Sequence, residues 1–261
     1  MGRKEIKIDL LIHDFNIPLA VIESSISLLL KKPEKYGLLT EKQEKVLNRT
    51  LRNTKVIQML VSDLLELGRS REGIFKLTTF RLSTLFEETF IELFDLVDSD
   101  TSERIKTCSR LDELKEILSK NDLALVVDEA LWSQEVCLDE SKIKQILRNL
   151  LSNALKYRRR FIEITVDKKD DQLFFSIHND GKGILSVFHK KIFESYFYLE
   201  LKDLGTVRGS GLGLAGVMVL IEDLGGKLFI ESEEGKGAKF SLKIPLEKKC
   251  EHGSDQPRRS P

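Results

Sequence analysis

The sequence has few cysteines and no long apolar run. Its three cysteines, Cys108, Cys137 and Cys250, form no CxxC pair and have no histidine at ligand spacing. We therefore expect neither a zinc site nor a disulfide framework, and we predict free thiols in a reducing compartment. No apolar stretch approaches the ~20 residues that cross a bilayer, and the N-terminal stretch MGRKEIKIDLLIHDF has charges on both sides of its apolar residues, unlike a signal peptide. We predict a cytoplasmic chain, or the cytoplasmic part of a longer one, with no membrane segment.

An excess of charge of one sign is also absent. The chain has 42 Lys and Arg against 42 Asp and Glu, and its longest basic cluster is Arg158-Arg159-Arg160. Binding of nucleic acid through a basic field needs a concentrated positive face, so we predict no nucleic-acid partner. Apolar residues at 41% and charged residues at 32% are typical of a soluble globular protein. The 261 residues suffice for one large domain or two ordinary ones.

Residues 1–72 predict a helical hairpin. Apolar residues of the first helix recur every three or four positions, as in the seam of a helical bundle, at Ile8, Ile12, Phe15, Leu19, Ile22, Ile26 and Leu29. Pro33 and Gly37 end this helix, and Thr40 followed by Glu41 starts a second one with its own broad apolar stripe. One hairpin cannot bury both stripes, whereas two copies can form a four-helix bundle, so we predict a homodimer.

Residues 73–247 predict a domain of mixed helices and strands. We expect strands at 75–80, 123–128, 161–167 and 173–178, helices at 82–97, 140–157 and from 214, and a final hairpin of 227–232 with 238–246. Between 98 and 121, apolar residues recur every three positions from Ile105 to Ile117 and predict one extra amphipathic helix. This stretch is either a tolerated surface insertion or a partner-docking helix. Residues 248–261 are polar and predict a disordered tail.

Three short segments carry candidate chemistry. In the helix at 140–157, Asn149, Asn153 and Lys156 line one strip. Amide oxygens and an ammonium suit Mg²⁺ with attached phosphates, although a solvated polar face gives the same pattern.

The second segment, HNDGKGI at residues 178–184, follows a strand. Its glycines permit close approach to a ligand and an Asn or Asp side chain can pair with a base edge, although a tight turn needs the same residues. The third, GSGLGL at 209–214, opens a helix whose backbone N–H groups can hold a phosphate. Its spacing fits neither a Rossmann fingerprint nor a P-loop.

The order of these segments resembles one family. An asparagine-bearing helix, a DGKGI turn, IFESYF and GSGLGL follow one another over residues 149–214, as in the ATP-binding domain of sensor histidine kinases, which belongs to the GHKL superfamily of gyrase, Hsp90 and MutL. HDFNIPL at 13–19 resembles the phosphoacceptor box of that family, and LVSDLLELGR at 60–69 resembles the end of its second dimerisation helix. The resemblance covers residues 6–247. It implies an α+β protein, with a dimeric helical hairpin (1–72) followed by an α/β-sandwich ATP-binding domain of the GHKL type (73–247).

The resemblance also implies roles for single residues. Asn153 and Asn149 would hold Mg²⁺, Lys156 would contact phosphate and Tyr157 the nucleotide. The adenine pocket would include Asn179, Asp180 (through water), Gly181, Gly183 and Ile184. A mobile lid would include residues 192–197 with Phe193. The hinge of that lid and its contacts with phosphate would include Arg208, Gly209, Gly211, Leu212 and Gly213.

His13 would be the phosphoacceptor. On a wheel of 100° per residue it points roughly 150° away from the seam, which leaves the imidazole accessible, although a lone exposed histidine is usually only a polar surface residue. Asp14 can orient the ring and raise its nucleophilicity, and Pro18 can bend the helix nearby.

The sequence departs from the family pattern in two places. Asn179 stands where Asp usually pairs with the adenine amino group, and an amide keeps one acceptor for that contact. In the phosphoacceptor box, Asn16 replaces a basic residue and Ile17 replaces the Thr or Asn that helps to position water for dephosphorylation. Because Ile has no donor or acceptor, we predict weak phosphatase activity.

The sequence thus predicts a two-component histidine kinase core. It would use Mg-ATP to phosphorylate His13 and pass the phosphoryl group to an Asp of a response regulator receiver domain, with input from a partner or an upstream sensor. The alternatives are a catalytically degenerate, nucleotide-binding dimeric signalling scaffold and a different GHKL ATPase. Neither alternative would form phosphohistidine.

Overall fold

The computed structural model describes residues 8–71, 75–193 and 213–246, without the side chains of 8–13, 63 and 65–71. The chain divides into two compact units, Met1–Arg69 and Ser70–Pro261, and each is described by itself. Among the described helices, none combines the length and the hydropathy that a bilayer crossing requires.

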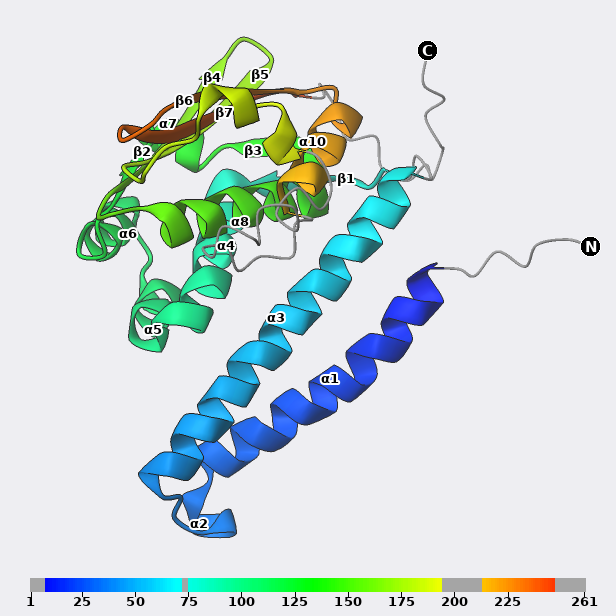
Figure 1. Cartoon of the computed structure of the whole chain (residues 1–261), viewed down its shortest axis with the longest axis vertical. Helices are drawn as coiled ribbons and strands as arrows, with labels where there is room; N and C mark the ends of the chain where they lie inside the picture. Colours follow the sequence, from blue (N-terminus) through cyan, green and yellow to red (C-terminus); the bar gives the residue numbers. More distant parts are fainter. Residues whose placement is uncertain (1–7, 72–74, 194–212, 247–261) are drawn as a thin grey trace, which may run out of the picture. The chain divides into compact units, whose positions relative to one another are not determined.

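The first unit is the expected helical hairpin. It contains α1 (Ile8–Lys31), a short α2 (Pro33–Tyr36) that the sequence did not predict, and most of α3 (Glu41–Arg71) (Figure 1). The predicted start of the second long helix is confirmed by a reciprocal cap. The Thr40 N–H donates to Gln43 Oε1 (2.8 Å), and the Gln43 N–H donates to Thr40 Oγ1 (3.3 Å).

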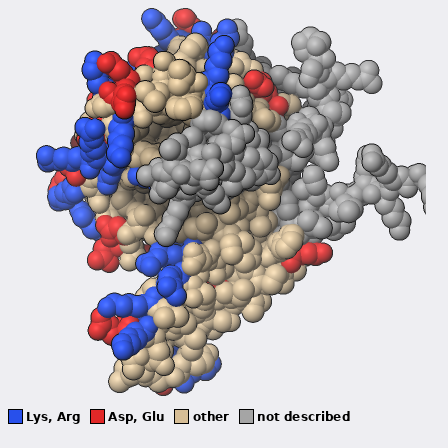
Figure 2. Space-filling view, viewed as in Figure 1, with Lys and Arg blue, Asp and Glu red and all other residues tan. Residues whose placement is uncertain are grey.

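One hairpin leaves much of its apolar surface exposed. Ile26 is buried, but Phe15, in the same predicted seam, is 52% exposed. Further exposed apolar side chains on the two long helices include Val21, Ile22, Leu28, Val46, Val56 and Ile57. Over the hairpin, the face seen in Figure 2 is mostly uncharged. The expectation that a single copy cannot bury these stripes is therefore confirmed.

The second unit is built on a five-stranded mixed sheet of order β2-β4-β5-β7-β6. Its strands are β2 (Leu123–Val126), β4 (Ile162–Lys169), β5 (Gln172–Asn179), β6 (Lys227–Glu233) and β7 (Gly237–Pro245). β2 pairs in parallel with β4, and the other pairs are antiparallel. A separate two-stranded sheet joins β1 (Leu77–Arg81) to β3 (Glu135–Asp139). The predicted strands are confirmed to within a few residues, whereas β3 and the short α7 (Glu129–Trp132) were missed.

Helices cover one face of the five-stranded sheet. α4 (Leu82–Val97), α8 (Glu140–Tyr157) and α10 (Gly213–Asp223) lie on the same side of it (Figure 1). Burial alternates along β5, where Phe175, Ile177 and Asn179 point into this layer, and the Phe175 ring meets that of Phe86 from α4. The sequence predicted α4 and α8 with these same bounds.

Two helices, not one, occupy residues 98–121. Asp98 caps α5 (Ser99–Thr107) by accepting from the N–H groups of Asp100 and Thr101, and α6 (Leu111–Ser119) follows. Ile105 and Leu114 are buried in the main core. The prediction of a single helix was therefore wrong, and the apolar residues that suggested it pack into the core. The two interpretations of this stretch, a tolerated surface insertion and a partner-docking helix, stay predictions.

Of the two cysteines that the structure describes, one agrees with the expectation of free thiols and one differs from it. Cys108 is a free thiol, and burial, followed by the nearby carboxylates of Glu87 and Glu113, raises its pKa. Cys137, which we expected to be free, is disulfide-bonded.

Candidate nucleotide site and phosphoacceptor helix

The candidate site is organised around the C-terminal half of α8. Asp139 caps this helix by accepting from the Lys142 N–H (3.2 Å), and the apolar face of the helix is buried. Asn149 and Asn153 are half-buried beside that face, while Lys156 is exposed. The predicted polar strip thus lies at the edge of the core.

Asn149 has spare hydrogen-bonding capacity. Its Nδ2 is buried and has no hydrogen-bond partner. A Cβ placed on Gly213 would lie 3.4 Å from Asn149 Oδ1, so the first residue of α10 packs against this amide. Because an unpaired buried donor is costly, the position fits a site that a ligand oxygen completes. Within the described residues no group of three His, Cys, Asp or Glu can hold a metal, so a Mg²⁺ ion here would rely on amide and phosphate oxygens.

The turn after β5 is packed against the end of α8. A Cβ on Gly181 would overlap the Tyr157 carbonyl oxygen, so only glycine allows this approach. Next to it, Asp180 Oδ1 accepts from the N–H groups of Arg159 (3.0 Å), Arg160 (3.0 Å) and Phe161 (2.9 Å). Desolvation raises the pKa of Asp180, but the backbone donors outweigh it and hold that pKa below its ordinary value. Asp180 therefore fastens the turn after α8, and its water-mediated contact with adenine stays a prediction.

Asn179 is the buried polar residue of this turn, with only 5% of its surface exposed. In the amide orientation that satisfies both neighbours, Nδ2 donates to the Ala238 carbonyl oxygen (3.2 Å) and Oδ1 accepts from the Gly181 N–H (3.1 Å). The strand pairing of β5 with β7 places Asn179 directly opposite Ala238.

The β6–β7 turn holds the segment that follows. Ser232 Oγ accepts from the Ile184 N–H (2.8 Å) and donates to the Gly237 carbonyl oxygen (2.6 Å). A Cβ on Gly183 would overlap the Glu233 carbonyl oxygen. Sequence reasoning missed Ser232 and Gly237 as positioning residues, and the glycine-rich turn between the last two strands was the available signal.

The remaining predicted site residues fall into two groups. Phe193 packs edge-on against Phe240 of β7 (ring centroids 6.5 Å apart), and its contact with nucleotide stays a prediction. Arg208, Gly209, Gly211 and Leu212 lie outside the described residues.

In the hairpin unit, His13 lies in α1 near the N-terminal end of that helix. Its side chain is outside the described part, so the predicted accessibility of its imidazole is not tested. Asp14 is exposed, and Ile17 is 53% exposed.

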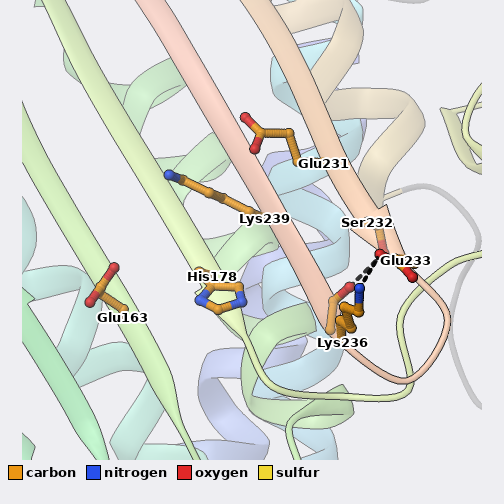
Figure 3. Close-up of a pocket in the computed structure, with 8 residues that line it drawn as sticks. Glu163, His178, Glu231, Ser232, Glu233, Lys236 and Lys239 are labelled. Carbon is orange, nitrogen blue, oxygen red and sulfur yellow. Dashed lines mark hydrogen bonds and ion pairs between the residues drawn. The ribbon is translucent and has the colours of Figure 1, made fainter.

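A pocket on the other face of the sheet borders this site, because Ser232 and Gly237 of the β6–β7 turn also line it. It is lined by Glu163, His178, Lys239 and Glu231, which lie side by side on neighbouring strands, together with the turn that carries Lys236 (Figure 3). Because side chains alternate along a strand, His178 points away from the helices while Asn179 points toward them. The segment that the sequence presented as one motif is therefore divided between two faces.

The fold and the clustered segments define a helical hairpin joined to an ATP-binding domain of the GHKL type. Residues 138–248 match the model of the histidine kinase-, DNA gyrase B-, and HSP90-like ATPase family. Residues 10–73 match the His Kinase A (phospho-acceptor) domain. These two matches together cover more than half of the chain. The chain belongs to the sensor histidine kinases and has the two domains of their catalytic core.

Individual relatives agree with this assignment. The sensor protein KdpD of Clostridium acetobutylicum is 29% identical over 238 residues, which cover 90% of this chain and 24% of that protein. The sensor histidine kinase YkoH of Bacillus subtilis is 27% identical over 89% of this chain and 45% of its own length. The chain thus spans less than half the length of these relatives.

Solved structures share the fold. Full-length ShkA in complex with AMPPNP has a TM-score of 0.60 at 21% sequence identity. The matched region covers 97% of this chain and 47% of the ShkA chain. The Acinetobacter baumannii histidine kinase AdeS has a TM-score of 0.53 at 20% identity, over 90% and 98% of the two chains.

Proposed function

We propose that this chain uses ATP to phosphorylate His13 and then transfers the phosphoryl group to an Asp of a response regulator receiver domain. In the first step, the bond between the γ-phosphorus and the β,γ-bridging oxygen breaks as a bond to an imidazole nitrogen forms, and ADP leaves with the electron pair. Asp14 would hold the proton on the other ring nitrogen. Such transfers need positioning and charge neutralisation more than covalent machinery.

One observation carries the nucleotide-binding part of the proposal. Asn149 meets the start of α10 at Gly213, and the end of α8 at Tyr157 meets the turn at Gly181. Segments far apart in the sequence thus converge along one helix, in the order that the family resemblance implies. Lys156, exposed on the same strip, would contact the phosphates, and the buried amide of Asn179 would pair with the base.

The proposed nucleotide site would also hold a divalent cation. Asn153 and Asn149 would hold Mg²⁺, which when bound would neutralise charge on the β- and γ-phosphates. Replacing Asn153 by Ala should therefore weaken ATP binding in the presence of Mg²⁺ and leave binding in EDTA unchanged. Equal losses under both conditions would contradict the assignment.

We also infer that two copies assemble through the hairpin. The exposed apolar side chains of α1 and α3 would form the interior of a four-helix bundle. Light scattering on the whole chain should give the mass of a dimer, and a monomer across the accessible concentration range would refute the assembly.

The decisive experiment is incubation with γ-labelled ATP. We expect acid-labile, alkali-stable label on the wild-type chain, and none after His13→Gln, while nucleotide affinity is unchanged because His13 belongs to the other compact unit. Label should then move to an added receiver domain. Nucleotide binding without label in the wild type would favour the scaffold alternative, to which the unusual Asn179 gives some support. ATP hydrolysis without phosphohistidine would indicate a different GHKL ATPase.

A further inference from the structure

Asn179, the residue proposed to contact the base, has a neutral side-chain amide. The nitrogen and the oxygen of this amide each use only part of their hydrogen-bonding capacity. Asn179 Nδ2 has two N–H groups and donates one to the Ala238 carbonyl oxygen, and Oδ1 has two lone pairs and uses one for the Gly181 N–H. Counting its contacts with the described residues, one donor and one acceptor therefore remain on the same side chain.

Neighbouring side chains add little to this capacity. Ala238 presents only a buried methyl group. The Ser232 hydroxyl is used by the Ile184 N–H and the Gly237 carbonyl oxygen, and Asp180 is turned toward the N–H groups of residues 159–161. The Asp180 carboxylate is thus occupied by backbone N–H groups, and it is not free to pair with the same group of a ligand as Asn179.

We propose that Asn179 lets this site accept 6-oxopurine as well as 6-aminopurine nucleoside triphosphates. The inference rests on the proposed function, in which Asn179 contacts the base. An exocyclic amino group would donate to the spare lone pair of Oδ1, and an exocyclic oxo group would accept the spare N–H of Nδ2. A carboxylate at this position has acceptors only, and would leave a 6-oxo group facing another acceptor.

Three nucleotides that differ at position 6 of the purine test the proposal on the wild-type chain. ATP carries an amino group there, ITP an oxo group together with a hydrogen on the neighbouring N1, and purine riboside triphosphate only hydrogen. Equilibrium dialysis at fixed Mg²⁺ should give dissociation constants for ATP and ITP within about fivefold of each other. The purine riboside nucleotide should bind roughly five- to tenfold more weakly than both, because one hydrogen bond to the amide is lost.

The variant Asn179→Asp supplies the matched comparison. It should weaken ITP relative to ATP by about tenfold or more, since the spare donor is gone. The ratio is measured within one protein, so a general loss of stability cancels, and melting without nucleotide reports that loss separately.

Each other outcome is decisive. Rejection of ITP by the wild type, or equal binding of all three nucleotides, would overturn the inference and leave ATP binding intact. If the variant does not fold, the wild-type comparison decides alone. Failure of all three nucleotides to bind would remove the proposed function, and the inference with it.

Discussion

A fully buried lysine at the start of α8 offers a sharp test of how this unit is held together. The Lys142 ammonium lies 2.7 Å from Asp223 Oδ2, with the lysine side chain 0% exposed and the aspartate side chain 20% exposed. It also lies 4.1 Å from the centroid of the Phe75 ring. Lys142 of α8 thus contacts both Phe75, near the beginning of the unit, and Asp223, the last residue of α10.

The two halves of this pair should not be equally costly to remove. Asp223→Ala leaves a buried ammonium with the Phe75 ring as its remaining described partner, and loss of one member of a buried pair costs about 3–5 kcal/mol. The cation–π contact brings our expectation to the lower end, about 3 kcal/mol. Lys142→Met removes the buried charge and keeps the volume, while the partly exposed Asp223 can hydrate, so we expect about 1 kcal/mol. The double variant should be no less stable than Asp223→Ala.

Urea unfolding followed by tryptophan fluorescence measures these costs. Trp132 is the single tryptophan of the chain, is 5% exposed and lies in the same unit. The exposed pair of Glu116 on α6 and Lys120, which follows that helix, is the control, and its substitutions should change the midpoint very little. If Lys142→Met destabilises as much as Asp223→Ala, burial of an unpaired charge is not the cause of the asymmetry, and the reasoning fails.

Three further predictions concern other parts of the chain. Burial, and after it the negative charge of Glu88, raises the pKa of Glu87. The contribution of Glu87 to stability is therefore present below its unfolded pKa of about 4.3 and is lost as the pH rises through its folded pKa. Glu87→Gln should raise the melting temperature at pH 7 and have no effect on it at pH 3. Gly183→Ala should abolish nucleotide binding or folding, because its Cβ would overlap a carbonyl oxygen. Gly235→Ala has open space around its Cβ, so urea unfolding should show a loss of only about 1–2 kcal/mol from backbone strain. Ile17→Thr should speed loss of label from a phosphorylated receiver domain, and an unchanged rate would refute the explanation from the missing polar group.

Elements with one buried face were predictable from the sequence. The helix at α8 has an apolar stripe of period 3.6 beside a polar strip, and its bounds follow from that pattern. β3 was missed because four of its five residues are buried, so no alternation marks it as a strand. The three-residue spacing from Ile105 to Ile117 suggested one helix, but it spans two short ones, since α5 ends before Cys108 and α6 starts at Leu111.

The residues of the candidate site could be named from the sequence, but their contacts could not. Asp180 illustrates the limit. Its partners are backbone N–H groups about twenty positions earlier, at Arg159, Arg160 and Phe161. Backbone donors carry no residue-specific signal, so a carboxylate that fastens a turn looks the same in the sequence as one that faces a ligand. The opposite orientations of His178 and Asn179, by contrast, follow directly from strand alternation.

The close approaches that shape the site are contacts between backbones. Carbonyl oxygens of Tyr157, Glu233 and Asn179 occupy the space that a Cβ would need on Gly181, Gly183 and Gly237, respectively. The backbone path of the turn therefore depends on glycine at these three positions, together with the hydrogen bonds of Asp180 and Ser232. An amide and a carboxylate at residue 179 can both accept from the Gly181 N–H, but only the amide can donate to the Ala238 carbonyl oxygen. Asn179 therefore takes part both in the geometry of the turn and in the proposed contact with the base, so Asn179→Asp should lower stability as well as change the nucleotide preference. The ratio of ATP to ITP affinity separates the second effect from the first.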